Sequence, residues 1–404
     1  MMKAVIRPAD ILLPRDADMR KWSVIACDQF TSERDYWDRV REETEGSPTT
    51  LSMIIPEAYL NDGPALESAA GTCRAMKDYL DAGVFRTLES SYIYVEREVT
   101  GGVRHGIVGA IDLEAYDFTP SSKSPVRASE RTVEERLPPR MLIREAAQLE
   151  LPHILVLIDD PEMRVIEPLA KRTAELEKVY DFDLMEGGGH ITGYRISGEE
   201  AERLTEAFGA LAEKELQYVV GDGNHSLAAA KELWNRVRLT LSDEERENHP
   251  ARFALVEVNN VYDEGVRFEP IHRVVFNIDP AKLIETLHEK IEQPDGREIA
   301  CVAGGRIVDT VRVRGKSFGR MVDTLEETLE EFAAAGDGTV DYIHDEEAVM
   351  RLTAEEGSAG FLLPAMDKAD LFRTVEHDGV FPKKSFSIGH AKDKRYYLEC
   401  RKIK

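Results

Sequence analysis

The spacing of hydrophobic residues changes along the chain, and each spacing predicts a different element. Residues 92–99 alternate well enough to predict a strand, the turn at residues 100–102 reverses the chain and residues 103–111 return it, which predicts a β-hairpin. Short apolar runs at residues 153–158 and 218–220 predict buried strands. Because strands and helices are mixed without strict alternation, we expect a mixed-sheet α/β or α+β architecture.

Helical periodicity is clearest after residue 223. Leu227, Ala230, Trp234 and Val237 repeat with the spacing i, i+3, i+7 and i+10, which predicts an amphipathic helix that packs on a sheet. Pro168 suits the first turn of another predicted helix, over residues 168–179.

A further apolar stripe over residues 325–332 predicts a helix with a strongly acidic side. We expect its acids to form a solvated face. They are Glu326, Glu327, Glu330 and Glu331.

Length and charge limit the classes of partner. With 404 residues, 42% of them hydrophobic, the chain is long enough for more than one domain. A charged stretch at residues 242–249 suggests a boundary, so we expect domains at residues 1–248 and 249–404. The 76 acidic and 52 basic residues give a formal net charge of −24, which repels nucleic acid and anionic membranes. Neither is an expected partner, and a homo-oligomer stays open.

Cysteine spacing and the N-terminal sequence indicate the compartment. Cys27, Cys73, Cys301 and Cys400 lie far apart and form no C-x-x-C pair, so we expect reduced, structural thiols. The first residues lack the apolar core of a signal peptide, and no apolar run approaches membrane-spanning length. We therefore expect a cytoplasmic protein.

The junction at residues 218–231 combines the features of an anion-binding site. An apolar run stops at Gly221-Asp222-Gly223, and a helix-forming run follows at once. The glycines allow unusual backbone angles and a close approach of a ligand. The first turn of a helix adds N–H groups and the positive end of its dipole. We expect a phosphate to bind here, in contact with Gly221, Gly223, Asn224 and Ser226.

Two side chains at this turn are suited to acid–base chemistry. Asp222 can accept the proton of an attacking hydroxyl or hold Mg²⁺, although aspartate is also a common turn-former and helix cap. His225 can bind phosphate or relay a proton, or it can be a hydrogen-bonded turn histidine. Asn224 and Ser226 can donate to phosphate oxygens or cap the helix.

Other motifs narrow the choice of chemistry. The sequence contains no G-x-x-x-x-G-K-[ST] loop, no G-x-S-x-G elbow and no H-E-x-x-H helix. Residues 381–390 gather two lysines and two hydroxyls in an otherwise acidic chain, so Lys383, Lys384 and Ser385 are candidate ligand contacts.

Several segments together resemble the bacterial and archaeal DUF1015 family, whose core resembles the ParB/sulfiredoxin fold. That superfamily includes the free serine kinases, and its usual signature, Asp-Gly-His-His-Arg at a helix start, holds nucleotide phosphates. Here the signature reads Asp222-Gly223-Asn224-His225-Ser226. Because its first His and its Arg are replaced, another cation is needed. The resembling segments are residues 22–37, 104–116, 130–132 with Arg136, 221–230, 269–273 and 381–397. The candidate cations are Arg131, Arg136, Arg273, Lys383 and Lys384.

The resemblance implies a fold and an activity. The implied fold is a ParB/sulfiredoxin-like core with a mixed sheet, followed by a C-terminal α/β region. The implied activity is transfer of a phosphoryl group from ATP or ADP, with Mg²⁺, to a small hydroxyl compound such as L-serine. In the kinases an N-terminal carboxylate is the general base, and Asp28 or Glu33 would fill that role. The alternatives are a non-catalytic nucleotide sensor and a phosphatase or nucleotide hydrolase using the same pocket.

Overall fold

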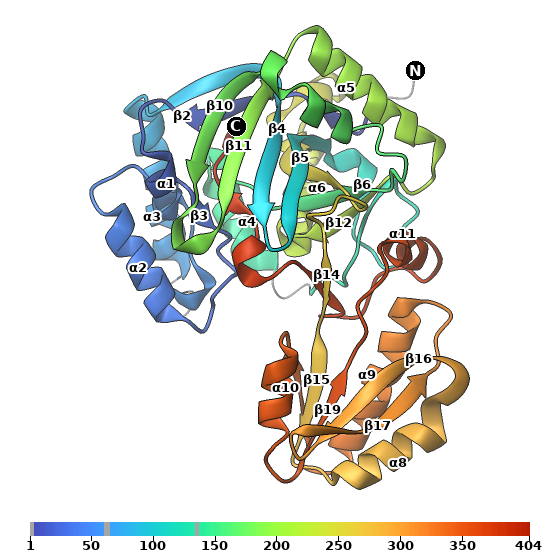
Figure 1. Ribbon diagram of the computed structural model, residues 1–404. Coiled ribbons are helices and arrows are strands. Elements are labelled where there is room, and N and C mark those ends of the chain that lie inside the picture. The colour runs from blue at the N-terminus through green and yellow to red at the C-terminus, as the bar shows by residue number, and fades with distance from the viewer. Residues whose placement is uncertain (1–3, 60–64, 134–136) are drawn as a thin grey trace. The chain divides into compact units, whose positions relative to one another are not determined.

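The chain divides into two compact units in the computed structural model, which describes residues 4–59, 65–133 and 137–404 (Figure 1). Unit 1 comprises residues 1–128, 132–266 and 389–404, and unit 2 comprises residues 129–131 and 267–388. The last segment of the chain therefore belongs to unit 1. The domain boundary predicted between residues 248 and 249 stays a prediction.

Unit 1 contains most of the strands and seven of the described α-helices. Its strands are β1 (Ile6–Arg7), β2 (Ala9–Pro14), β3 (Val24–Ile25), β4 (Phe85–Val99), β5 (Gly102–Asp112), β6 (Tyr116–Asp117), β7 (Val126–Ala128), β8 (Leu149–Glu150), β9 (Leu155–Ile158), β10 (Glu177–Asp183), β11 (His190–Ile196), β12 (Tyr218–Asp222), β13 (Phe253–Asn260), β21 (Tyr396–Tyr397) and β22 (Arg401–Lys402). Its helices are α1 (Met19–Trp22), α2 (Arg34–Thr44), α3 (Ala65–Asp81), α4 (Leu137–Ala146), α5 (Glu199–Ala210), α6 (Asn224–Val237) and α7 (Asp243–Asn248).

Eleven of these strands form one mixed sheet. Its order is β10-β11-β4-β5-β13-β9-β12-β7-β6, with β1 paired to β5 and β2 paired to β4. The pairs β13–β9, β12–β7 and β6–β7 are parallel, whereas β12–β9 and β13–β5 are antiparallel. The predicted hairpin is confirmed as β4 and β5 (Figure 1). Two short strands from the C-terminal segment pair elsewhere, β21 with β3 and β22 with β8.

The two faces of this sheet are buried in two different hydrophobic cores. Successive residues of a strand point to opposite faces, and β4 follows this rule: Tyr92 and Tyr94 lie in one core, Ile93 and Val95 in the other. Helices α5 and α6 pack into the first core, and α2 and α3 pack into the second. Both faces are therefore covered, which explains why β13 begins with the continuous apolar run at residues 253–256.

Helix α6 forms as its sequence predicts. Leu227, Ala230 and Trp234 are buried against the sheet, which confirms the amphipathic stripe. Ala228 and Ala229 pack instead against Leu137 and Met141 of α4. Small alanine side chains allow α4 to lie close to α6, and the candidate site lies at this end of unit 1.

Unit 2 is a smaller α/β unit. Its strands β15–β19 form a five-stranded sheet in the order β17-β16-β19-β15-β18, and β14 pairs with β20. Helices α8 and α9 pack on this sheet, and α10 contributes Val349 to a cluster with Val274 and Val302 (Figure 1). The strands are β14 (Phe268–Pro270), β15 (His272–Phe276), β16 (Glu292–Ala303), β17 (Arg306–Val313), β18 (Thr339–Ile343), β19 (Ser358–Leu362) and β20 (Phe386–Ile388). The helices are α8 (Pro280–Ile291), α9 (Phe318–Ala334), α10 (Glu346–Leu352) and α11 (Lys368–His377).

Two predictions of local structure are wrong. Residues 168–179 do not form an α-helix: only short 3-10 turns precede β10, which pairs with β11. Strand pairing thus outweighs the local helical preference. Glu326 is not solvated, because it is buried and forms an ion pair with Arg273. The other three glutamates of α9 are exposed, as predicted.

The described helices can be compared with the length and composition that a membrane span requires. In the described part of the chain, no helix has both the length and the apolar composition that a bilayer span requires.

Candidate functional site

The predicted strand–turn–helix junction is present in unit 1. Strand β12 ends at Asp222 and helix α6 begins at Asn224, with Gly223 between them in the left-handed region at φ 78°. A Cβ at Gly223 would lie 2.9–3.0 Å from atoms of Ile154, so both the backbone angle and the space require glycine. The register of β12 against β9 shifts at Gly221. Such irregularities re-aim neighbouring side chains.

Asp222 forms an ion pair at the start of the helix. Its Oδ1 accepts the amide N–H of Gly223 at 2.9 Å, and its Oδ2 lies 3.1 Å from Nζ of Lys394. The side chains are 21% and 10% exposed, so this pair is largely withdrawn from water. Lys394 thus places a positive charge beside the turn. In this turn, Ser226 stands where the resembling signature has arginine.

Buried arginines fix the backbone that carries Lys394. Arg97 donates to the carbonyl oxygen of Lys394 at 2.7 Å, and Arg104 donates to the preceding carbonyl at 3.0 Å. Arg395 forms an ion pair with Glu257 at 2.8 Å. Burial opposes the charge of Glu257, but Arg104 and Arg395 outweigh it and lower the pKa of Glu257. The position of Lys394 is therefore set by a dense network of buried charges.

A second carboxylate, Asp28, lies within electrostatic range of the same lysine. Burial opposes its charged form, but His153, a hydrogen bond from Gln29 and the charge of Lys394 outweigh burial, so the pKa of Asp28 is lowered. Asp28 is therefore ionised at neutral pH. Lys394 acts electrostatically on both Asp28 and Asp222, which brings two of the predicted catalytic residues together.

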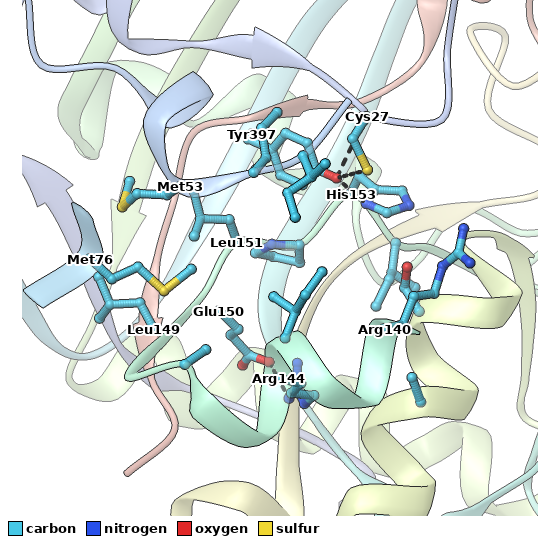
Figure 2. Close-up of a pocket in the computed structure, with 18 of the residues that line it drawn as sticks. Cys27, Met53, Met76, Arg140, Arg144, Leu149, Glu150, Leu151, His153 and Tyr397 are labelled. Carbon is cyan, nitrogen blue, oxygen red and sulfur yellow. Dashed lines mark hydrogen bonds and ion pairs between the residues drawn. The ribbon is translucent and has the colours of Figure 1, made fainter. Parts of the chain in front are cut away.

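Tyr397 links two side chains that interact electrostatically with Asp28. Its hydroxyl lies 2.9 Å from Nδ1 of His153 and 3.1 Å from Sγ of Cys27 (Figure 2). Burial, and then the charge of Asp28, raise the pKa of Cys27 to about 12. Cys27 is therefore a neutral thiol at neutral pH rather than a nucleophile.

A cavity of about 180 Å³ lies against this group and the first turns of α6. Cys27, His153 and Tyr397 line it together with Ser226 and Ala229 of α6. Its other walls are mostly apolar. Figure 2 shows methionine and leucine side chains there, namely Met53, Met76, Leu149 and Leu151. The cavity thus joins an apolar pocket to a polar group of side chains.

Two arginines of α4 also line this cavity, and each has a carboxylate partner. Arg140 pairs with Glu57, and Arg144 pairs with Glu150 at 2.5 Å. A ligand in the cavity meets paired charges on this wall, and the lining residues nearest in sequence to Asp28 and Lys394 are Cys27 and Tyr397.

Some groups of the predicted phosphate cradle are engaged within the protein. The amide of Ser226 donates to the carbonyl oxygen of Gly223 at 3.0 Å, and the amide of Gly223 donates to Asp222. Nε2 of His225 accepts the amide N–H of Val133 at 3.1 Å. The amides of Gly223 and Ser226 are therefore already hydrogen-bonded within the protein.

The predicted general bases differ in position. Asp28 lies in the cluster described above, whereas Glu33 is an exposed residue at the N-cap of α2. The arrangement therefore favours Asp28.

Several predicted contacts lie in unit 2. The guanidinium of Arg273 is fully buried beside Glu326, and the ammonium groups of Lys383 and Lys384 lie 5.4 and 5.2 Å from the ring centroid of Tyr342. Their part in ligand binding stays a prediction, and Arg136 lies outside the described residues. The residues of this set in unit 2 are Arg131, Arg273, Lys383, Lys384 and Ser385.

The carboxylate, histidine and cysteine side chains of the described residues do not suit a metal ion held by the protein alone. Within residues 4–59, 65–133 and 137–404, no group of three or more His, Cys, Asp or Glu side chains is arranged to hold one. Asp222, the predicted Mg²⁺ ligand, is already neutralised by Lys394, whereas Mg²⁺ favours carboxylates with geometry close to octahedral.

Lys394, His153 and Tyr397 were not singled out from the sequence. For Lys394 and Tyr397 the signal in the sequence is the resembling segment 381–397, which also contains Lys392 and Arg395; His153 lies outside it.

Three solved structures resemble the chain at low similarity. A free serine kinase in complex with AMP has 12% identity and a TM-score of 0.40, covering 73% of this chain and 91% of that chain. SbnI from Staphylococcus aureus, with a C-terminal truncation, has 12% identity and a TM-score of 0.36, covering 70% and 82%. A conserved hypothetical protein from Pyrococcus furiosus has 14% identity and a TM-score of 0.33, covering 72% and 90%. At these TM-scores the likenesses define no activity for this chain.

No curated protein matches the sequence. A family model described as a protein of unknown function, DUF1015, matches residues 6–388, which is nearly the whole chain. The resemblance found in the sequence is thereby confirmed, and the chain belongs to the DUF1015 family.

Proposed function

We propose that unit 1 binds a nucleotide at the start of α6 and transfers a phosphoryl group from ATP or ADP to a small hydroxyl compound. The observation that supports this most is the Asp222–Lys394 ion pair at the strand–turn–helix junction, with Asp28 beside the same lysine. Phosphoryl transfer requires positioning and charge neutralisation more than covalent chemistry. A helix start, a buried ammonium group and an ionised carboxylate meet those requirements.

Lys394 is the proposed phosphate-binding cation. Its ammonium group is held 3.1 Å from Asp222, so its position is fixed before a ligand arrives. Ser226 lines the cavity, and its hydroxyl is a further donor for the phosphate. Because the chain carries a net charge of −24, the site needs this local positive charge to attract a nucleotide.

Asp28 is the proposed general base, and Asp222 the residue that orients Lys394. Both oxygens of Asp222 are engaged, by Lys394 and by the amide of Gly223. The lowered pKa of Asp28 keeps it ionised and able to accept a proton. In the step, the acceptor oxygen bonds to phosphorus, the bond from phosphorus to the bridging oxygen breaks, and the hydroxyl proton passes to Asp28.

The cavity of about 180 Å³ is the proposed place for the organic part of a ligand. Its apolar wall suits either the base of the nucleotide or the body of the acceptor. L-serine is the first acceptor to test, since residues 222–226 resemble the superfamily signature. The ParB/sulfiredoxin-like core is part of the same proposal.

The test is phosphoryl transfer followed by ³¹P NMR. The full chain is incubated with ATP or ADP, with and without Mg²⁺, and with L-serine or other small hydroxyl compounds. A new phosphate ester is the expected result. Nucleotide binding without any turnover indicates a sensor, and phosphate release that needs no acceptor indicates a hydrolase.

Variants test the assigned roles. Asp28→Asn should lower kcat roughly 10²–10⁴-fold, the usual contribution of a general base. Asp222→Asn should nearly abolish turnover while nucleotide affinity stays within about tenfold, or 1.4 kcal/mol. Asp243→Asn is the matched control, because Asp243 is an exposed residue of α7. Unchanged turnover in both Asp28→Asn and Asp222→Asn would contradict the mechanism.

A further inference from the structure

A second cavity in unit 1 gathers basic side chains. It has a volume of about 450 Å³ and is lined by Arg7 of β1, residues of β2, and Arg401 and Lys402 of β22. The site proposed above uses none of these residues. The volume lies within the range of small-molecule sites, about 300–1,000 Å³.

Arg7 is the distinctive residue of this cavity. Its guanidinium carbon lies 3.2 Å from the ring centroid of Phe253, so the planar group is stacked on an aromatic face. Its side chain makes no hydrogen bond or ion pair with any residue in the described part of the chain. A half-buried guanidinium with unused donors is costly, because its N–H groups have partly lost water without gaining acceptors.

Neighbouring arginines add to this positive charge, but their own donors are in use. Arg401 forms an ion pair with Glu150 at 2.6 Å, and Arg252 forms one with Asp112 at 2.6 Å. Burial, and then the charge of Arg401, lower the pKa of Arg7, with Asp112 acting in the opposite direction. An anion that enters the cavity would therefore find unused hydrogen-bond donors on Arg7 rather than on Arg401 or Arg252.

The cavity is lined mainly by basic residues, although the protein as a whole is strongly acidic. The whole chain has a net charge of −24, yet this wall has four basic side chains and one acid, Asp10. Asp10 forms no ion pair with a lysine or arginine of the described residues. Its Oδ1 accepts the amide N–H of Ser90 at 2.8 Å. Lys402 is exposed and makes no ion pair with a described residue. The basic residues are Arg7, Arg401, Lys402 and Lys404.

We propose that this cavity binds a small organic anion, with the guanidinium of Arg7 bound to its carboxylate or phosphate group. The rigid fork of an arginine matches both groups and forms two parallel hydrogen bonds with either. Stacking on Phe253 leaves the edge of the fork for the ligand. Thr87, Ser90 and Asn248 also line the cavity, and these polar residues suit the polar remainder of the ligand.

Isothermal titration calorimetry on the full chain tests this site. The probes are inorganic phosphate, glycerol 3-phosphate and succinate, so that phosphate and carboxylate groups are distinguished. Arg7→Gln removes the guanidinium. Arg15→Gln is the matched control, an exposed arginine outside the cavity. Lys394→Met weakens the phosphate site proposed above and leaves this one intact.

At least one probe should bind saturably at millimolar concentration. Arg7→Gln should weaken that binding at least about tenfold, whereas Arg15→Gln and Lys394→Met should keep it. Lys402→Gln gives a second test at an exposed position, where folding is not at risk, and should weaken binding several-fold. The proposal is overturned if no probe binds, or if binding persists in both Arg7→Gln and Lys402→Gln. Binding that is lost only in Lys394→Met belongs to the nucleotide site and also overturns it.

Discussion

Replacing Lys394 by methionine is the most direct test of the nucleotide site. Methionine has nearly the length of the lysine side chain but no charge, so the change removes the ammonium group beside Asp222. The backbone at residue 394 is held by Arg97 through the carbonyl oxygen, which the substitution does not alter. The expected effect is therefore on ligand binding more than on the local fold.

The magnitude follows from the geometry of the ion pair. Two unit charges 3.1 Å apart attract by about 5 kcal/mol at an effective dielectric constant of about 20, before desolvation is subtracted. Desolvation leaves a net contribution of about 1.5–3 kcal/mol for a hydrogen bond to a charged group. A phosphate that binds Lys394 with similar geometry should lose that amount, which corresponds to about a 10- to 150-fold rise in Kd.

Calorimetric titration of ATP and ADP into wild type and Lys394→Met measures this loss. Lys392→Met is the matched control, because Lys392 is an exposed lysine two residues away in the same segment. Asp222→Asn provides the opposite case, since it frees Lys394 from its carboxylate partner and should not weaken nucleotide binding by more than about tenfold. Circular dichroism melts confirm that each variant is folded.

Equal nucleotide affinity in wild type and Lys394→Met would refute the reasoning. The phosphate would then bind elsewhere, and the ion pair with Asp222 would be a structural contact. A loss of equal size in Lys392→Met would indicate a general effect of charge rather than a specific contact.

Three further predictions concern stability. Gly223→Ala should lower the free energy of unfolding by about 1–3 kcal/mol in urea melts, because φ is 78° and the added Cβ would meet Ile154; an unchanged midpoint would contradict the strain argument. Glu257→Gln should cost about 3–5 kcal/mol by the same method, since it leaves the buried Arg104 without its carboxylate and leaves Arg395 only Glu399, and a cost below 1 kcal/mol, roughly the value of a surface pair, would argue against it. The hydrogen bond from Nδ1 of His105 to Asp263 raises the pKa of His105, so its contribution is complete below the unfolded pKa of about 6.5 and is lost as pH rises through the higher folded pKa. His105→Gln should therefore destabilise the protein by about 1.5–3 kcal/mol at pH 5.5 and by less at pH 9, and a pH-independent effect would contradict this assignment.

The sequence by itself determined the elements that depend on interactions between residues close together in the chain. The β4–β5 hairpin follows from alternation and a glycine turn, and α6 follows from a stripe of apolar residues at helical spacing. The strand–turn–helix junction follows from Gly221-Asp222-Gly223, since few other residues adopt the angles it needs. These features depend on residues close together in the chain, so the sequence alone was sufficient. Residues 168–179 are the exception, because their pairing partner, β11, lies outside the segment.

Tertiary structure decided which charges meet. The C-terminal segment returns to unit 1 and brings Lys394 to Asp222 and Tyr397 to His153, contacts between residues far apart in the sequence. Tertiary structure also decided that Glu326 is buried beside Arg273, a residue far from it in the sequence. An ion pair of this kind depends on chain topology and on the balance between desolvation and attraction, neither of which has a local sequence pattern.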